Sequence, residues 1–122
     1  MEEKIIFDRV IQRVLSVSDE EFADLSVSRL ALFFNMERSK LSRQFKRQLN
    51  ITLESFLFRE KMSRAAFLLM ANRNITVKEV AEKLGFCACD YFIKKFKGYY
   101  GTRPGSYKEI KNHKKASLKT TH

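Results

Sequence analysis

The 122-residue chain carries a formal net charge of +10 at pH 7, and 44% of its residues are hydrophobic. This apolar content excludes a wholly disordered chain, and the length allows one compact domain or two small lobes that share a helix. Residues 1–25 hold three basic and seven acidic side chains, so the basic surplus lies entirely in residues 26–122. Such a basic segment is typical of nucleic-acid-binding proteins, although a generally soluble basic surface gives the same charge.

The first predicted element is a helix over residues 3–16, where apolar side chains recur along one helical stripe. Residues 17–26 are rich in aspartate and serine and are predicted to be mainly a connection. Within this segment, Ser18 and Glu21 have the spacing of a capping box, which could start a short turn.

Two short helices are predicted next, over residues 27–34 and 38–49, with a turn at Asn35 between them. A loop at Asn50 ends the second of these helices. Thr52 can then cap the longest predicted helix, which continues to about Met70.

The second half of the chain repeats this pattern. A capping box at residues 76–79 opens a helix that runs to residue 84, and Gly85 provides the turn. A helix over 88–99 follows, and then a last short helix over 105–110. Residues 111–122 contain mostly Lys, His, Ser and Thr, which predicts a disordered basic tail.

The two halves share a quasi-repeat, in which Leu30-Ala31-x-x-Phe34-Asn35-Met36 returns as Val80-Ala81-x-x-Leu84-Gly85-Phe86. An alanine allows two helices to cross closely, and asparagine or glycine permits a left-handed turn. An apolar pair four residues apart follows each copy, at Leu41 and Phe45 and, one residue out of step, at Phe92 and Phe96. The pattern predicts two helix-turn-helix motifs in tandem.

We therefore expect an all-α fold of about seven helices, with two helix-turn-helix subdomains joined by a long linker helix. The expected parts are an N-terminal helix with its connection, a first helix-turn-helix, a linker helix, a second helix-turn-helix with the final short helix, and the basic tail. Their predicted ranges are 1–24, 25–52, 53–72, 73–110 and 111–122.

Catalytic and metal sites are not expected. Both histidines, His113 and His122, lie in the tail, and the sequence has no metal-ligand cluster and no glycine-rich phosphate loop. Cys87 and Cys89 are too close in sequence for an ordinary disulfide. A redox sensor or half of a metal site is one interpretation of this pair, and reduced cysteines at the start of a helix are the other. We expect no enzyme activity, no cofactor and no bound metal.

The predicted helix 38–49 has a second face opposite Leu41 and Phe45, and it holds basic and hydroxyl side chains without an acid. Arg43 is the strongest candidate for reading a base, because its guanidinium can donate two hydrogen bonds to guanine O6 and N7. We predict base readout by Ser39, Ser42 and Arg43, and phosphate contacts by Arg38, Lys40, Lys46 and Arg47. A solvated charged helix face is the alternative.

The predicted helix 88–99 presents a more mixed surface opposite Phe92 and Phe96, with Asp90, Lys94 and Lys97 outward and Tyr91 and Ile93 beside them. A carboxylate repels phosphate but can accept a hydrogen bond from cytosine N4, and an isoleucine can touch a thymine methyl group. Phosphate contacts on this side are assigned to Lys97 and Arg103.

Residues 25–109 resemble the DNA-binding domain of the AraC/XylS family of bacterial transcription regulators. The most specific part of the resemblance is Ile75-Thr76-Val77-x-x-Val80-Ala81-x-x-Leu84-Gly85-Phe86, which continues through Phe92, Phe96, Lys97, Gly101, Pro104 and Tyr107. The linker-helix pattern of the family is present as well, with Lys61 where an arginine is usual.

The resemblance implies two helix-turn-helix units on one linking helix, each placing its second helix in one of two successive major grooves. The base-contact positions of the family near the start of the second recognition helix fall on Cys89, Asp90, Tyr91, Ile93 and Lys94. Glu37 and Cys87 occupy positions where the family commonly has a serine cap, so both recognition helices are expected to start less firmly.

The expected function is sequence-specific binding of double-stranded DNA and transcription regulation in bacteria. A nonspecific architectural nucleic-acid-binding protein is the alternative. RNA polymerase is an expected partner from the resemblance, and a small-molecule effector is expected only if a further domain exists. A cytoplasmic, nucleoid-associated location without a membrane partner is expected, because no apolar run approaches the about 20 residues of a spanning helix.

Overall fold

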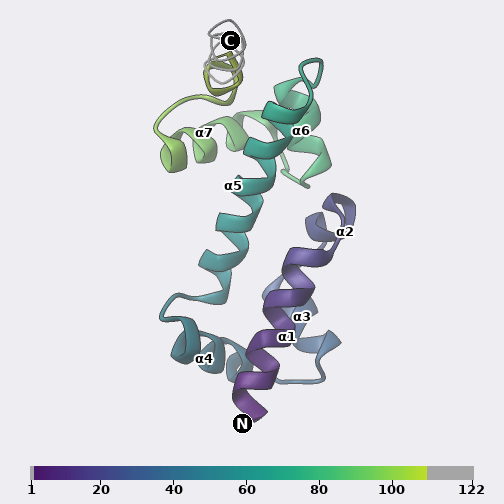
Figure 1. The fold of residues 1–122 in the computed structure, drawn as a ribbon, viewed down its shortest axis with the longest axis vertical. Coiled ribbons are helices and arrows are strands. Elements are labelled where there is room, and N and C mark those ends of the chain that lie inside the picture. Colours follow the sequence, from purple (N-terminus) through teal and green to yellow (C-terminus); the bar gives the residue numbers. More distant parts are fainter. Residues whose placement is uncertain (1, 110–122) are drawn as a thin grey trace, which may run out of the picture. The chain divides into compact units, whose positions relative to one another are not determined.

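The computed structural model describes residues 2–109, and within this range helices are its only regular secondary structure (Figure 1). The all-α prediction is confirmed. Residues 104–109 form a final helical segment, where 105–110 was predicted; residue 110 and the predicted tail at 111–122 lie outside the described residues. The helices are α1 (Glu2–Ser16), α2 (Asp19–Ala23), α3 (Val27–Phe33), α4 (Arg38–Leu49), α5 (Leu53–Ala71), α6 (Val77–Lys83) and α7 (Cys89–Tyr100).

Helix α2 corrects the prediction that residues 17–26 are mainly a connection. The Ser18 hydroxyl accepts a hydrogen bond from the Glu21 amide at 3.2 Å, and acidic residues fill the first turn, where the helix dipole favours them. Phe22 is 4% exposed and anchors the short helix in the core. The burial of this one aromatic ring outweighs the turn-forming tendency of the surrounding aspartates and serines.

The chain divides into two compact units, and the division falls inside α5: unit 1 ends at Lys61 and unit 2 begins at Met62. In unit 1, α3 and α1 pack against α4. The rings of Phe7 and Phe56 lie 5.3 and 5.4 Å from the ring of Phe45, measured between centroids. The fully buried side chains of this core are Val10, Val14, Leu30, Leu41, Phe45 and Leu53.

Unit 2 packs α6 against α7 and has a core rich in aromatic rings. Phe96 lies at the centre of this cluster, with the rings of Phe92, Tyr100 and Tyr107 at 5.7, 4.6 and 5.3 Å. Two side chains tie this region to other backbone segments of the unit: Tyr100 donates to the Met62 carbonyl at 3.1 Å, and Lys108 donates to the Ile75 carbonyl.

Helix starts agree with the predicted caps at two places. The Thr52 hydroxyl accepts a hydrogen bond from the Ser55 amide at 3.0 Å at the start of α5. Thr76 and Glu79 form the complete capping box of α6, with hydrogen bonds of 3.0 and 3.1 Å.

No helix among the described residues combines the length and the apolar character needed to cross a membrane.

The quasi-repeat extends to the backbone of the turns. The Met36 amide donates to the Ala31 carbonyl at 2.8 Å, and the Phe86 amide donates to the Ala81 carbonyl at 2.9 Å. Each of these hydrogen bonds encloses a residue with a left-handed backbone, and the same conformation ends each second helix. The four positive φ angles are 55° at Asn35, 65° at Asn50, 79° at Gly85 and 78° at Gly101.

Gly98 inside α7 and Gly101 at its C-terminal end provide a matched test of the role of the left-handed conformation. A Cβ added at Gly101 or at Gly98 meets no atom within 4 Å, so alanine fits sterically at both. Gly101→Ala is expected to lower the free energy of unfolding by about 1 kcal/mol, because φ is positive there. Gly98→Ala is expected to raise it by about 0.5–1 kcal/mol, because Gly98 lies inside the helix. Urea denaturation measures both, and two changes of the same sign would contradict the argument.

Ionisation of the Tyr100 hydroxyl is expected to make the folded protein less stable at alkaline pH. Burial raises the pKa of Tyr100 above its ordinary value of 10.0, and the neighbouring Tyr107 and Tyr99 raise it further. The folded protein therefore keeps this proton at a pH where the unfolded chain loses it. The contribution of Tyr100 to the free energy of unfolding is complete below pH 10.0, and it is lost as the pH rises through the higher pKa of the folded state.

Tyr100→Phe should therefore flatten the fall in unfolding free energy above this pH, measured by denaturant titration at several pH values. Tyr91→Phe leaves the hydrogen bond of Tyr100 to Met62 in place and is the control. An unchanged alkaline slope in Tyr100→Phe would exclude this tyrosine as the cause.

Candidate nucleic-acid interface

Helix α4 is divided between a buried and an exposed face, as the sequence predicts. Leu41 and Phe45 are each 1% exposed and point into the core of unit 1. Ser42 is half-buried at the edge of the opposite face. The other predicted contact residues of this helix are all exposed: Arg38, Ser39, Lys40, Arg43, Lys46 and Arg47. Their accessibility satisfies a condition for binding DNA, while the individual contacts remain predictions.

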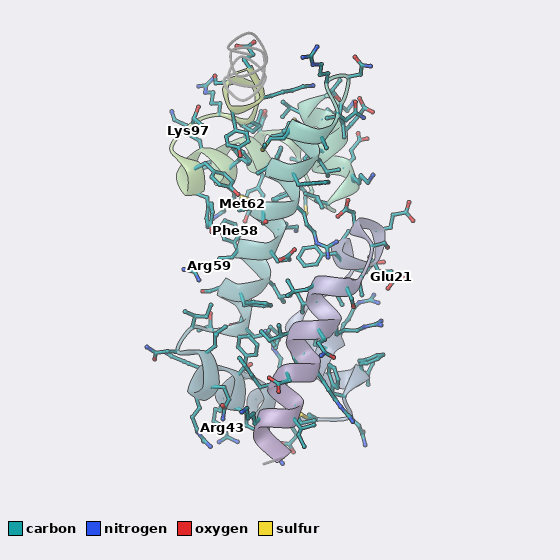
Figure 2. The ribbon with its side chains drawn as sticks, viewed as in Figure 1. Glu21, Arg43, Phe58, Arg59, Met62 and Lys97 are labelled. Carbon is teal, nitrogen blue, oxygen red and sulfur yellow. The ribbon has the colours of Figure 1, made fainter. Side chains whose placement is uncertain are left out.

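The last turns of α4 lead into an open depression on unit 1. On one side it is lined by residues of α4, which are Ser42, Arg43, Lys46 and Arg47. On the other side it is lined by the loop after α4 and the start of α5, through Asn50, Thr52 and Glu54. Figure 2 shows the Arg43 side chain extending away from α4. The depression therefore joins the strongest candidate for base readout to two candidates for phosphate contact, with one acid at its border.

The start of α4 lacks a side-chain cap. Glu37 is the N-cap residue and makes no capping hydrogen bond, and the first turn contains Arg38 and Lys40 but no acid. Both features weaken the first turn, because the helix dipole disfavours cations at this end. They also concentrate positive charge where amide hydrogens point out of the helix, which favours an anion such as a phosphate group.

Helix α7 is built in the same way, with Phe92 and Phe96 both 0% exposed. Of the residues predicted to contact DNA from α7, Asp90, Tyr91, Lys94 and Lys97 are exposed, and Cys89 and Ile93 are half-buried; Arg103 beyond the helix is exposed. Figure 2 shows Lys97 on the outer side of α7. The face thus combines lysines with an acid and a tyrosine, unlike the uniformly basic face of α4.

The cap of α7 corrects one prediction. Ala88, and not Cys87, is the N-cap residue, and α7 has no side-chain cap. The reason is the one-residue offset of the repeat: the N-cap lies four positions before the first inward residue in both helices, at Glu37 before Leu41 and at Ala88 before Phe92. Cys87 therefore lies one residue outside the cap.

The two cysteines are free thiols, with Cys87 exposed and Cys89 half-buried. Cys89 is the first residue of α7, in agreement with the interpretation of reduced cysteines at the start of a helix. Among the described residues, no group of three histidine, cysteine or acidic side chains is placed to hold a metal ion.

Lys95 also lies on this surface, although it is not among the residues predicted from the sequence to contact DNA. Its ammonium lies 5.4 Å from the centre of the Tyr91 ring, and the Tyr91 ring lies 6.2 Å from that of Phe86. These contacts hold an exposed aromatic ring between a cation and the turn. The four-residue spacing of Tyr91 and Lys95 is the sequence signal that could have indicated the pair.

Two helix-turn-helix units, each exposing the outer face of its second helix, define a tandem helix-turn-helix protein. A sequence model of a family described as a helix-turn-helix domain matches residues 30–110. The chain belongs to this family, and the resemblance to the AraC-type DNA-binding domain is confirmed. The family is one of DNA-binding transcription regulators.

Individual relatives agree with this assignment. The chain is 31% identical over 96 residues to an uncharacterized HTH-type transcriptional regulator, YfiF, of Bacillus subtilis, and 31% identical over 91 residues to the Msm operon regulatory protein of Streptococcus mutans. These matches cover 79% and 74% of this chain but only 30% and 32% of the relatives. The chain thus spans about a third of the length of the curated relatives it matches.

A solved structure matches in both sequence and fold. It is the C-terminal domain of AraT, a response regulator from Geobacillus stearothermophilus, with 30% identity and a TM-score of 0.76. The match covers 86% of this chain and 84% of that domain. The similarity therefore extends over nearly the whole of a domain that occurs at the C-terminal end of a longer regulator.

Proposed function

We propose that the chain binds double-stranded DNA sequence-specifically and regulates transcription, with α4 and α7 as its two reading helices. The observation that carries the proposal is the exposed face of α4, which presents basic and hydroxyl side chains and no acid on the second helix of a helix-turn-helix. Base readout is assigned to Arg43 with Ser39 and Ser42, and phosphate contact to Arg38, Lys40, Lys46 and Arg47.

The second reading helix has a different role in the proposal. Asp90 lies in the first turn of α7, where a phosphate would be repelled but cytosine N4 could donate to the carboxylate. Cys89, Tyr91, Ile93 and Lys94 are the remaining candidates for base contact, and Lys97 and Arg103 for phosphate contact. We therefore expect unit 1 to supply most of the specific affinity and unit 2 to be the weaker reader.

The partners of the chain follow from the same proposal. Double-stranded DNA is its ligand, and contact with RNA polymerase is expected of a regulator of this family. Its place of action is then the cytoplasm, where bacterial DNA is found. We expect no enzymatic activity, and a small-molecule effector belongs to the proposal only if a longer protein contains a domain to bind it.

Selection of bound sequences from a random duplex library tests this function. The proposal expects a defined consensus, and the selected duplex should bind at least tenfold more tightly than its scrambled version, which is about 1.4 kcal/mol. A library that yields no consensus, together with equal affinity for scrambled duplexes and a steep salt dependence, would instead identify a nonspecific architectural binder.

Asp90→Asn separates two roles of this carboxylate. If Asp90 faces DNA, the substitution should raise affinity for most duplexes and reduce any preference for cytosine at one position. If it mainly stabilises the start of α7 through the helix dipole, the substitution should lower the unfolding free energy by about 0.3–1 kcal/mol and weaken all duplexes equally. Fluorescence anisotropy on matched and mismatched duplexes at fixed salt, beside a denaturation curve, distinguishes these results. Equal weakening of every duplex would refute the placement against DNA.

A further inference from the structure

A pair of adjacent apolar side chains is left uncovered at the end of α3. Leu32 is 82% exposed and Phe33 is 59% exposed. Single exposed apolar residues are common, but these two border depressions on the surface of unit 1: Phe33 and Arg13 line two of them, and Leu32 lines the one toward α2. Apolar side chains at the border of such hollows are a frequent feature of protein-binding surfaces.

The charges around this pair differ between the two depressions. The one toward α1 is lined by Arg9 and Arg13 and by no acidic residue. The one toward α2 contains Arg13 and Arg29 together with Glu21 and Asp24. The surface on the α1 side of Phe33 is therefore both apolar and cationic.

Arg13 has hydrogen-bonding capacity that unit 1 does not use. Its guanidinium lies 4.3 Å from the centre of the Phe33 ring, and its Nη2 is 4.0 Å from Glu21 Oε2, which is long for a hydrogen bond. Its Nε atom is buried and has no hydrogen-bond partner in the described structure. The side chain as a whole is 38% exposed, so a carboxylate of a partner would reach the guanidinium through its Nη atoms and not through the buried Nε.

We propose that this surface, formed by Arg9, Arg13, Leu32 and Phe33, binds an acidic segment of a protein partner that carries an apolar anchor. The anchor would cover Leu32 and Phe33, while carboxylates next to it, on the α1 side, would pair with Arg9 and Arg13. Charge complementarity and apolar burial would then act on the same segment, as they do when amphipathic peptides bind grooves.

Nucleic acid is a poorer occupant of this surface. A phosphate backbone offers the arginines an anion but offers Leu32 and Phe33 nothing apolar to contact. Figure 2 shows Glu21 on α2 and Arg43 on α4 at opposite ends of unit 1. Since Arg13 lies beside Glu21, the partner and DNA would use separate parts of the unit.

A displayed library of random peptides tests the proposal against the whole chain. Peptides of about 16 residues are long enough for roughly four helical turns. Peptides retained by the chain but not by Phe33→Ser should be enriched in aspartate and glutamate around a leucine or an aromatic residue. Phe33→Ser and Arg13→Glu should each weaken a selected peptide roughly thirtyfold, the size of effect expected at an interface hot spot.

Phe67→Ser is the matched control, because Phe67 is 69% exposed on α5 and belongs to unit 2, whereas the proposed surface belongs to unit 1. It should leave peptide affinity unchanged, and all three variants should keep the helical circular dichroism of the parent. Retained peptides without acidic residues, or equal losses in Phe33→Ser and Phe67→Ser, would overturn the proposal. Displacement of the peptide by duplex DNA would assign the surface to DNA, and self-association of the chain abolished by Phe33→Ser would assign it to a second copy; either result overturns it.

Discussion

Arg43→Ala is expected to relax sequence choice at one base pair and to weaken binding to the selected duplex by about 1–3 kcal/mol. The physical reason is the geometry of guanidinium, which can donate two hydrogen bonds to guanine but cannot match the edges of the other bases equally well. Arg43 is exposed on α4 and borders the depression at its end, so its removal leaves no cavity in the core.

Lys46→Ala is the matched control for this substitution, since Lys46 lies on the same exposed face and borders the same depression. A phosphate contact carries no sequence information, so this variant should weaken matched and random duplexes alike and should reduce the log-log salt slope by about 0.9. Anisotropy titrations on both duplexes measure these effects. Equal losses on both duplexes for Arg43→Ala would refute its assignment as a base reader.

Inserting about five base pairs between the two conserved blocks of the selected site should abolish specific binding, because half a helical turn moves one block to the other side of the duplex. We expect a site of about twenty base pairs, with blocks centred about ten base pairs apart. This expectation rests on the proposal that α4 and α7 read two successive major grooves from the same side of the duplex.

The same insertion placed outside the two blocks is the control and should leave affinity unchanged. Competition titrations against a random duplex provide the reference for nonspecific binding. If the internal insertion also leaves affinity unchanged, the two units do not read two grooves on one face of DNA.

Much of the fold could be predicted from local sequence signals. The bounds of α4 were predicted to the residue, because the left-handed positions Asn35 and Asn50 and the inward pair Leu41 and Phe45 all specify the same helix. α2 was missed because its stabilisation is tertiary. The polar residues around Phe22 indicate a turn, and only the burial of the ring in the core of unit 1 makes a helix the lower-energy state.

The outward faces of α4 and α7 could be predicted from periodicity because a buried pair fixes the rotation of each helix. The cap of α7 was placed one residue early, since the family pattern was applied without the offset that the repeat itself contains. The contact between Lys95 and Tyr91 was not predicted: their four-residue spacing allows it, but the side-chain rotamers decide whether it forms. Roles in DNA recognition remain predictions for every residue, since they depend on the ligand.

The weakly held first turn of α4 links the melting temperature of the protein to the anions around it. Glu37 makes no capping bond and Arg38 and Lys40 oppose the helix dipole, so a bound polyanion would neutralise an unfavourable charge arrangement in addition to making contacts. Any ligand that binds only the folded state raises stability by mass action. The first turn of α7 contains Asp90 instead, which already suits its dipole. Heparin, or even sulfate, should therefore raise the unfolding temperature of unit 1 more than that of unit 2. The thermal unfolding transitions of the two units would then occur at different temperatures, and the difference would depend on salt.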